Sequence, residues 1–257
     1  MSKNTNKKPL ILALETSGRI GSVAIAAGSQ LLAEKTFSTP VKHSAELFPA
    51  ITQLLTDFNK TPDDIEHIYL SIGPGSFTGL RLAVTFAKIM HLANNRIKIV
   101  AVDTLDVIAA NATDALHPCS CLPPTGHCLL ATGYCLPSTD YCSILDAKRS
   151  RFFIAAYRIT SIDKPPEKIL DDKLWTPQQF FDNFAASNKP LLLLGEGLVY
   201  YRNLFKHNSI DFLDEKYWYP SASKVYSIGH RLAEQNHFTN PLTLSPKYIQ
   251  SPDTGNW

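Results

Sequence analysis

The segment SIGPGSFTGLRLAVTFAKIM, residues 71–90, joins a short Gly/Pro turn to a long run with apolar residues at helical spacing. The glycines permit a tight strand-to-helix turn and the close approach of another backbone, and Ser76 is suited to cap the helix that follows. Turns of this kind can direct backbone N–H groups at an anion. The segment therefore predicts a strand, a turn and a helix, and it raises the question of whether the turn binds phosphate.

The sequence on either side predicts a mixed sheet flanked by helices. Continuous apolar runs indicate strands, and apolar stripes with a period of three to four residues indicate helices. Together they give the order β-β-β-α-β-α-β-α, which is typical of an α/β lobe. The expected strands are 9–15, 20–28, 31–38, 65–73 and 97–104, and the expected helices are 43–58, the second half of 71–90, and 105–112.

The second half of the chain fits a smaller lobe. It predicts a hairpin at 141–159, a helix at 175–184, a buried strand in PLLLLGEG at 190–197 and a helix at 221–236. Asp146 and Arg149 lie at the hairpin turn, where Asp146 fits either a functional role or a turn cap. The aromatic residues of this half fit either base stacking or core and rim packing; they are Tyr200, Tyr201, Tyr217, Trp218 and Tyr219.

Composition limits the classes of protein to which the chain can belong. Its 257 residues are 44% hydrophobic and 19% charged, which suits one or two globular domains. The formal net charge of +2 is too small to indicate a nucleic-acid-binding protein by itself. No apolar stretch is long enough to span a membrane, and the apolar run after the first eight residues is too short for a signal peptide. We therefore expect a cytoplasmic protein.

The cysteines form a short tandem repeat. Cys121, Cys128, Cys135 and Cys142 are spaced seven residues apart in CLPPTGH, CLLATGY and CLPSTDY. Zinc sites favour closer pairs of ligands, although His117 and His127 could complete a metal set. The alternative is a Pro/Gly/Ser/Thr-rich loop made by local duplication.

Several motifs in this order resemble one known family. They are LALETS at 12–17, HSAELFPAI at 43–51, IGPGSFTGLR at 72–81, AVDTLDVIAA at 101–110, ILDAKRSRFFIAAY at 144–157, GEG at 195–197 and SPKYIQ at 245–250. The chain resembles the TsaB (YeaZ) family of bacterial tRNA threonylcarbamoyladenosine biosynthesis proteins, glycoprotease-like members of the actin-like fold group. The resemblance covers about half the chain well, and 158–240 only weakly.

The resemblance implies an α/β, actin-like (ribonuclease H-like) fold with two lobes, each a mixed sheet flanked by helices. The lobes expected are an N-terminal one at 1–112 and a C-terminal one at 142–257. The Cys/Pro-rich repeat, at 113–141, falls between two family motifs and is expected to be an insertion loop.

The resemblance also implies a function. It is that of a non-catalytic partner subunit of the complex that transfers a threonylcarbamoyl group to adenosine 37 of tRNAs reading ANN codons. The chain would support the catalytic subunit TsaD by dimerising with it, with the TsaE ATPase as third member and tRNA contacted indirectly. A homodimer is the other expected assembly. No catalytic residue, metal or cofactor is expected for the chain alone, and ATP or ADP is expected only in the complex.

Two other activities are the alternatives. An independent actin-like nucleotide phosphotransferase or ATPase would need working groups at the first strand end, and a peptidase would need an assembled nucleophile and base, which the sequence does not offer. The helix at 43–58 opens with His43 and has Leu47 one turn on, so it lacks a second imidazole for a metal.

The nucleotide site, if any remains, lies where the first strand ends. An actin-like ATPase needs an acidic residue there to order magnesium and backbone donors to hold phosphate. This chain has Glu15, where the family usually has the shorter Asp, so the carboxylate moves by about 1 Å. The alternative is that Glu15 is a solvated or hydrogen-bonded strand end. The weak remnant site comprises Glu15, Thr16, Ser17, Gly75 and Ser76.

The hydrophobicity of the first two helices extends beyond one stripe, which favours a partner surface. An ordinary helix in a two-sided core is the alternative. By resemblance, the same two helices pair with those of TsaD or of a second copy. The partner-binding residues expected are His43, Leu47, Phe48, Ile51, Leu55, Thr78, Leu82, Phe86 and Met90.

Overall fold

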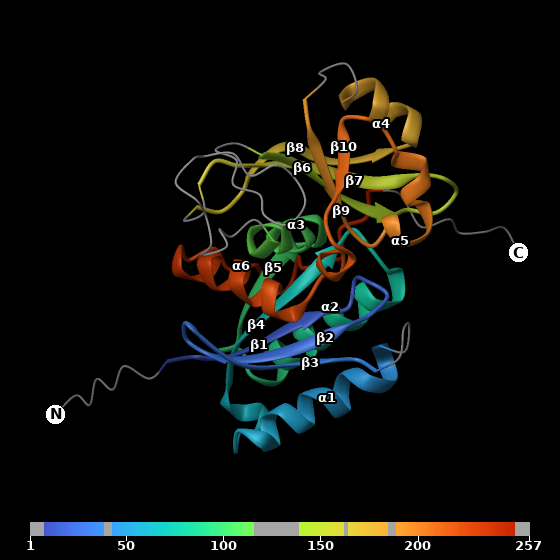
Figure 1. The fold of residues 1–257 in the computed structure, drawn as a ribbon. Helices are drawn as coiled ribbons and strands as arrows, with labels where there is room; N and C mark the ends of the chain where they lie inside the picture. Colours follow the sequence, from blue (N-terminus) through green and yellow to red (C-terminus); the bar gives the residue numbers. More distant parts are fainter. Residues whose placement is uncertain (1–7, 39–42, 116–138, 162–163, 185–188, 250–257) are drawn as a thin grey trace, which may run out of the picture. The chain divides into compact units, whose positions relative to one another are not determined.

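The computed structural model describes residues 8–38, 43–115, 139–161, 164–184 and 189–249. The chain divides into two compact units, and each has its own five-stranded sheet (Figure 1). Unit 1 comprises Met1–Val107 and Pro220–Trp257, and unit 2 comprises Ile108–Tyr219.

The sheet of unit 1 has the order β3-β2-β1-β4-β5. β1 pairs antiparallel with β2, and β2 with β3, whereas β1, β4 and β5 run parallel. Every residue of β1 is buried, which explains its continuous apolar run. The strands are β1 (Leu10–Glu15), β2 (Ser22–Ala27), β3 (Gln30–Thr36), β4 (Ile65–Gly73) and β5 (Lys98–Asp103).

Helices cover both faces of this sheet. α1 and α6 lie on opposite sides of it in Figure 1, and α1 and α2 share one core with β1. On the other face, Gly229 of α6 lies so near the Tyr69 ring that an added Cβ would be 2.7 Å from it. The helices are α1 (His43–Asp57), η1 (Pro62–Asp64), α2 (Phe77–Ala93), α3 (Thr104–Ala115), which crosses into unit 2, and α6 (Ala222–Glu234).

The sheet of unit 2, ordered β10-β9-β6-β7-β8, repeats this topology. Its first strand, β6, pairs antiparallel with β7 and parallel with β9, as β1 does with β2 and β4. The strands are β6 (Thr139–Asp146), β7 (Phe152–Ile159), β8 (Glu167–Trp175), β9 (Leu191–Leu194) and β10 (Ile210–Phe212), and the helices are α4 (Pro177–Phe184), α5 (Leu198–Tyr201), η3 (Arg202–Phe205) and η4 (Glu215–Tyr217). The predicted α/β, actin-like fold with two mixed sheets flanked by helices is confirmed.

The division of the chain differs from the predicted one in its last segment. The predicted C-terminal lobe, 142–257, included α6, but 220–257 belongs to unit 1. The reason is that α6 is amphipathic and buries its apolar side on the first sheet, where Ala222 N donates to Ser22 Oγ at 2.8 Å and Tyr226 OH to Gly28 O at 2.8 Å.

Two further differences concern the middle of the chain. α3 extends to Ala115 and β6 starts at Thr139, so both elements enter the predicted insertion, 113–141. Most of that insertion lies outside the described residues. Four of the five cysteines fall in this part, and they are Cys119, Cys121, Cys128 and Cys135. Cys142 is a free thiol buried in β6.

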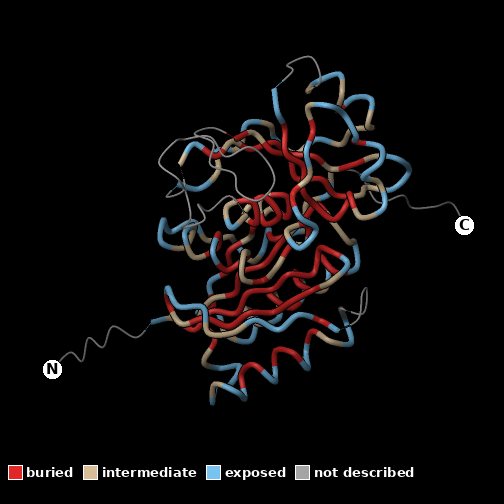
Figure 2. Tube along the Cα trace, in the orientation of Figure 1, coloured by how far each residue is buried: buried red, intermediate tan, exposed pale blue. Residues whose placement is uncertain are grey.

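Burial follows the two sheets. In Figure 2 the central strands of each unit are coloured red, because most of their residues are buried. β8, which the sequence did not predict, alternates exposed and half-buried residues along one edge of its sheet, and its charged residues hide the apolar pattern. Within the described ranges, no helix combines the length and apolar character needed to cross a bilayer.

Candidate functional site

Glu15 ends β1 and is fully buried. The backbone N–H of Ser17 donates to its Oε1 at 2.6 Å, and the Ser17 hydroxyl donates to the same oxygen. The carboxyl group therefore closes the turn that follows its own strand, which was the alternative explanation of Glu15.

Burial raises the pKa of Glu15 above its usual value of 4.5, although hydrogen bonds from Ser17 and Gly18 lower it in part. Desolvation favours the neutral form of a carboxyl group. A magnesium ligand has to be ionised, so the environment of Glu15 opposes the role that the corresponding Asp has in an actin-like ATPase.

The turn after β1 is bonded to the turn before α2. Ser76 N donates to Ser17 O at 2.7 Å, and Thr16 Oγ1 donates to Gly79 O at 2.8 Å. A Cβ on Gly75 would lie 2.5 Å from Ser17 O, so only glycine permits this approach. The structure thus brings all five remnant nucleotide residues together, but the Thr16 and Ser17 hydroxyls and the N–H groups of Ser17 and Ser76 donate within the chain.

These contacts do not fit a magnesium-bound phosphate. The backbone N–H groups of Ser17 and Ser76 have protein acceptors, and that of Gly79 donates to the Ser76 hydroxyl at 3.3 Å as the α2 cap. Across the described part of the chain, no group of three or more His, Cys, Asp or Glu residues could hold a metal ion. His43 begins α1, but its side chain lies outside the described residues.

The C-terminal segment closes the same turn from another side. Lys247 N donates to Ile72 O at 2.7 Å, and Lys247 Nζ pairs with Asp103 Oδ2 at 2.6 Å. Gly73, with φ of +119°, lies under this segment, since an added Cβ would be 2.7 Å from Lys247 O. The motif SPKYIQ was visible in the sequence, but its contact with the turn was not, because no local pattern encodes it.

The expected partner-binding residues divide into two groups. Leu47, Ile51, Leu55 and Phe86 are between 0% and 9% exposed and belong to the core of unit 1. The sequence interpretation of these four as surface is corrected, because α1 and α2 need them to pack on the sheet and on each other. The second apolar face is therefore smaller than the sequence suggested.

The large apolar side chains of α1 and α2 that stay exposed are Phe48 of α1 and those on one side of α2. Phe48 is 51% exposed, and its ring lies edge-on to Phe86 at 5.9 Å. On α2, Ile89 is 58% exposed and Leu92 85%. Spacings of three and four residues place the exposed α2 side chains on one side. We define the outer helix face as Phe48, Phe77, Thr78, Arg81, Leu82, Thr85, Lys88, Ile89 and Leu92.

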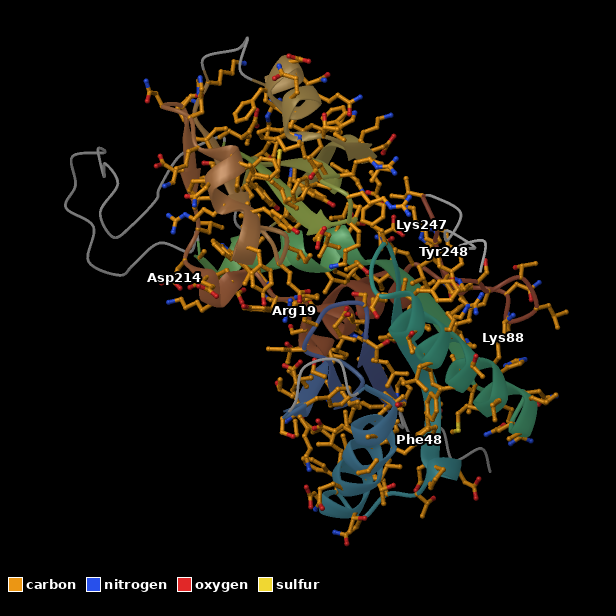
Figure 3. The ribbon with its side chains drawn as sticks, turned by 90° about the vertical axis from the view of Figure 1, so that its right-hand side faces the viewer. Arg19, Phe48, Lys88, Asp214, Lys247 and Tyr248 are labelled. Atoms are coloured by element: carbon orange, nitrogen blue, oxygen red, sulfur yellow. The ribbon has the colours of Figure 1, made fainter. Side chains whose placement is uncertain are left out.

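Figure 3 shows this side of unit 1, with Phe48 on α1 and Lys88 on α2. Leu82 is half-buried, as is Met90, which packs against the core. Sequence reasoning missed Phe77, Arg81 and Leu92, whose shared helical spacing was the available signal.

Three of the remaining candidates of unit 2, Asp146, Trp218 and Tyr201, have structural contacts. Asp146 Oδ1 accepts from Lys148 N at 2.7 Å, so Asp146 caps the hairpin turn. Trp218 is buried, with its Nε1 donating to Leu213 O at 2.9 Å. Tyr201 packs edge-on against Phe152, whereas Tyr200 is 65% exposed.

Comparisons with known proteins identify relatives of the chain. A family model described as "TsaD: tRNA N6-adenosine threonylcarbamoyltransferase" matches residues 30–238. The tRNA threonylcarbamoyladenosine biosynthesis protein TsaB of Bacillus subtilis is 37% identical over 101 residues, which are 39% of this chain and 44% of that protein. The match thus spans less than half the length of that relative. TsaB of Buchnera aphidicola subsp. Schizaphis graminum is 23% identical over 84% of this chain and 90% of its own.

Solved structures share the fold. YeaZ from Pseudomonas aeruginosa superimposes with a TM-score of 0.73 at 20% identity, over 94% of this chain and all of that one. A second structure of 18% identity and the same TM-score is described as similar to peptidase YeaZ from that organism. At these identities the likeness establishes the fold alone.

Proposed function

Since the chain belongs to the family described as tRNA N6-adenosine threonylcarbamoyltransferase TsaD, we propose that it acts in tRNA threonylcarbamoyladenosine biosynthesis as a TsaB-type, non-catalytic partner of TsaD. The complex would transfer a threonylcarbamoyl group to adenosine 37 of tRNAs reading ANN codons. In it, this chain supports TsaD by dimerising with it.

The observation that carries the proposal is the outer helix face. Phe48, Ile89 and Leu92 expose apolar side chains along two neighbouring helices. Burying them against a partner would stabilise a complex by about 25 cal/mol for each Å² of apolar area removed from water. Several exposed apolar side chains on one face of a folded unit indicate a protein contact.

The first-strand turn supports a non-catalytic role. Glu15 is buried and bonded to Ser17, and the two turns pack on each other. An independent phosphotransferase would have to break these bonds before phosphate and magnesium could enter. Turnover would then require a rearrangement of β1 and α2, the elements that form the unit 1 core.

The remaining members of the complex follow from the same proposal. The TsaE ATPase is the third component, ATP or ADP binds in the complex, and tRNA is reached through TsaD. A homodimer through α1 and α2 is the competing assembly, because a second copy could cover the same face. We expect the complex to form in the cytoplasm.

The test uses a double substitution on the outer helix face, Phe48→Ser with Ile89→Ser. Its matched control is Leu204→Ser, an apolar residue that is 44% exposed on η3 of unit 2. We expect the double variant to lose co-purification with TsaD and to abolish threonylcarbamoyladenosine formation, measured by mass spectrometry of digested tRNA. The control should retain both, and thermal unfolding should show both variants folded.

Three results would contradict the proposal. The double variant could bind TsaD as the wild type does, the wild type could fail to bind TsaD, or the isolated chain could turn over ATP at a rate that Glu15→Gln abolishes. The last result would point to an independent phosphotransferase.

A further inference from the structure

We propose that Arg81 recognises a carboxylate of the partner that docks on the outer helix face. The inference rests on the proposed function and adds the chemistry of the contact: an acidic side chain carried beside apolar residues on a partner helix.

Arg81 is held in place by two aromatic residues. Its guanidinium carbon lies 3.7 Å from the centroid of the Phe77 ring, and its Nε donates to the Tyr248 hydroxyl at 3.3 Å. The Phe77 and Tyr248 rings are themselves 5.4 Å apart. A guanidinium stacked on a ring keeps its other N–H donors in one plane, ready for a two-point contact with a carboxylate.

Phe77 and Tyr248, the two residues that contact Arg81, are themselves anchored by their neighbours in the chain. Tyr248 follows Lys247, which is fixed by its bonds to Ile72 O and Asp103. Phe77 is the first residue of α2, whose cap is Ser76. Figure 3 shows Tyr248 and Lys247 beside the N-terminal end of α2. Because both supports are anchored, little side-chain entropy is lost when Arg81 binds.

The charge of α2 calls for an acidic partner. α2 contains Arg81, Lys88 and His91 but no Asp or Glu. Of the residues that the structure describes, no carboxylate pairs with Arg81 or Lys88, whereas Lys247 and Arg158 have Asp103 and Asp140 as partners. Arg81 and Lys88 therefore lie among apolar side chains on a surface from which a docked partner would exclude water. A buried cation without a counterion is costly, so a partner that covers this face has to supply a carboxylate.

The apolar neighbours favour a protein over RNA. Phe77 and Leu92 lie on the same side of α2 as Arg81, and contact with a phosphate backbone would leave them in water. A second copy is also disfavoured where α2 faces α2, because each would oppose cations to cations.

The experiment measures the dissociation constant of the full chain for full-length TsaD by calorimetry at low and high salt. The variants are Arg81→Ala, Arg81→Lys and Arg81→Glu. The matched control is Arg202→Glu, whose guanidinium lies 4.6 Å from the Phe212 ring on unit 2. Thermal unfolding of each variant checks that it is folded.

We expect Arg81→Ala to weaken binding about tenfold or more. Arg81→Lys should weaken it less, because the charge is kept and the planar fork is lost. Arg81→Glu should weaken it most and should reduce the salt dependence of binding, while Arg202→Glu should bind as the wild type does.

Wild-type affinity and salt dependence in Arg81→Glu would overturn this inference alone. So would an effect of Arg81→Glu confined to self-association in light scattering, or to tRNA binding in a gel-shift assay. Failure of the wild type to bind TsaD would overturn the proposed function and this inference with it.

Discussion

The two halves of the segment 71–90 behave in opposite ways. Its turn is closed: the carbonyl of Ser17 accepts from Ser76 N, Gly75 touches the Ser17 backbone, and Lys247 covers Gly73. Its helix is open on one side, where Ile89 and Leu92 expose most of their surface. The backbone donors of Ser17 and Ser76 are engaged within the chain, and the apolar groups left exposed are those that a protein would bury.

The two halves of the segment differ in the kind of ligand that each could bind. A phosphate site requires free backbone donors, and here the N–H groups of Ser17, Ser76 and Gly79 have partners within the chain. A docking site requires apolar area that intramolecular packing has not used. The same short segment loses the first capacity and retains the second, so substitutions in its two halves and in α1 should affect different properties.

The largest effect is expected from Leu47→Ala, with its neighbour Phe48→Ala as the contrast. Leu47 is fully buried, and its truncation leaves a cavity that should lower the free energy of unfolding by about 2–5 kcal/mol. Phe48 is 51% exposed and should lose about 1 kcal/mol or less. Urea denaturation of the two variants measures both values.

The pair also separates stability from binding. Phe48→Ala should weaken association with TsaD while leaving the fold intact. Equal losses of stability in the two variants would mean that Phe48 belongs to the core and would remove it from the outer helix face.

A smaller loss of unfolding free energy is expected from a substitution that adds a side chain at Gly75. A methyl group there would lie 2.5 Å from Ser17 O, so Gly75→Ala should push the two turns apart and cost about 2–3 kcal/mol. The control is Ser76→Ala, which removes only the α2 cap and should cost about 1 kcal/mol. Thermal unfolding compares them, and a smaller loss for Gly75→Ala than for Ser76→Ala would show that the contact between the turns is loose.

Much of the fold was predictable because its signals are local. The apolar runs of β1, β4 and β9 and the cap at Ser76 are each encoded within a few residues. The placement of α6 on the sheet of unit 1 was not predictable, because the apolar pattern of an amphipathic helix does not indicate which of two sheets it covers. The strand β8 was missed because its charged residues hide the alternation of exposed and half-buried positions.

The site was predictable in outline only. Periodicity identified α1 and α2 as richly apolar, but it could not say that Leu47 faces the sheet while Phe48 faces outward. The Arg81 cluster depends on Tyr248, which is 167 residues away in sequence. Contacts of that kind arise from tertiary packing, and a single sequence carries no local trace of them.

The closed turn also predicts a pH dependence that can be traced to one group. Because burial raises the pKa of Glu15 above 4.5, the folded protein holds its proton at pH values where the unfolded chain has released it. Well below pH 4.5 the group is protonated in both states and has no effect. As the pH rises from there to the folded-state pKa, stability falls by about 1.4 kcal/mol for each pH unit.

Glu15→Gln removes this titration while keeping the shape and an oxygen that can accept from Ser17 N. The difference in unfolding free energy between Glu15→Gln and the wild type should therefore grow in favour of the variant as the pH rises above 4.5. Urea denaturation at pH 4, 5, 6 and 7, about one pH unit apart, measures that difference. Because the other titrating groups are the same in both proteins, their contributions to the difference cancel. A difference that shrinks with rising pH would mean that Glu15 is ionised in the folded protein, and the turn would then have to be regarded as a charged site open to a cation.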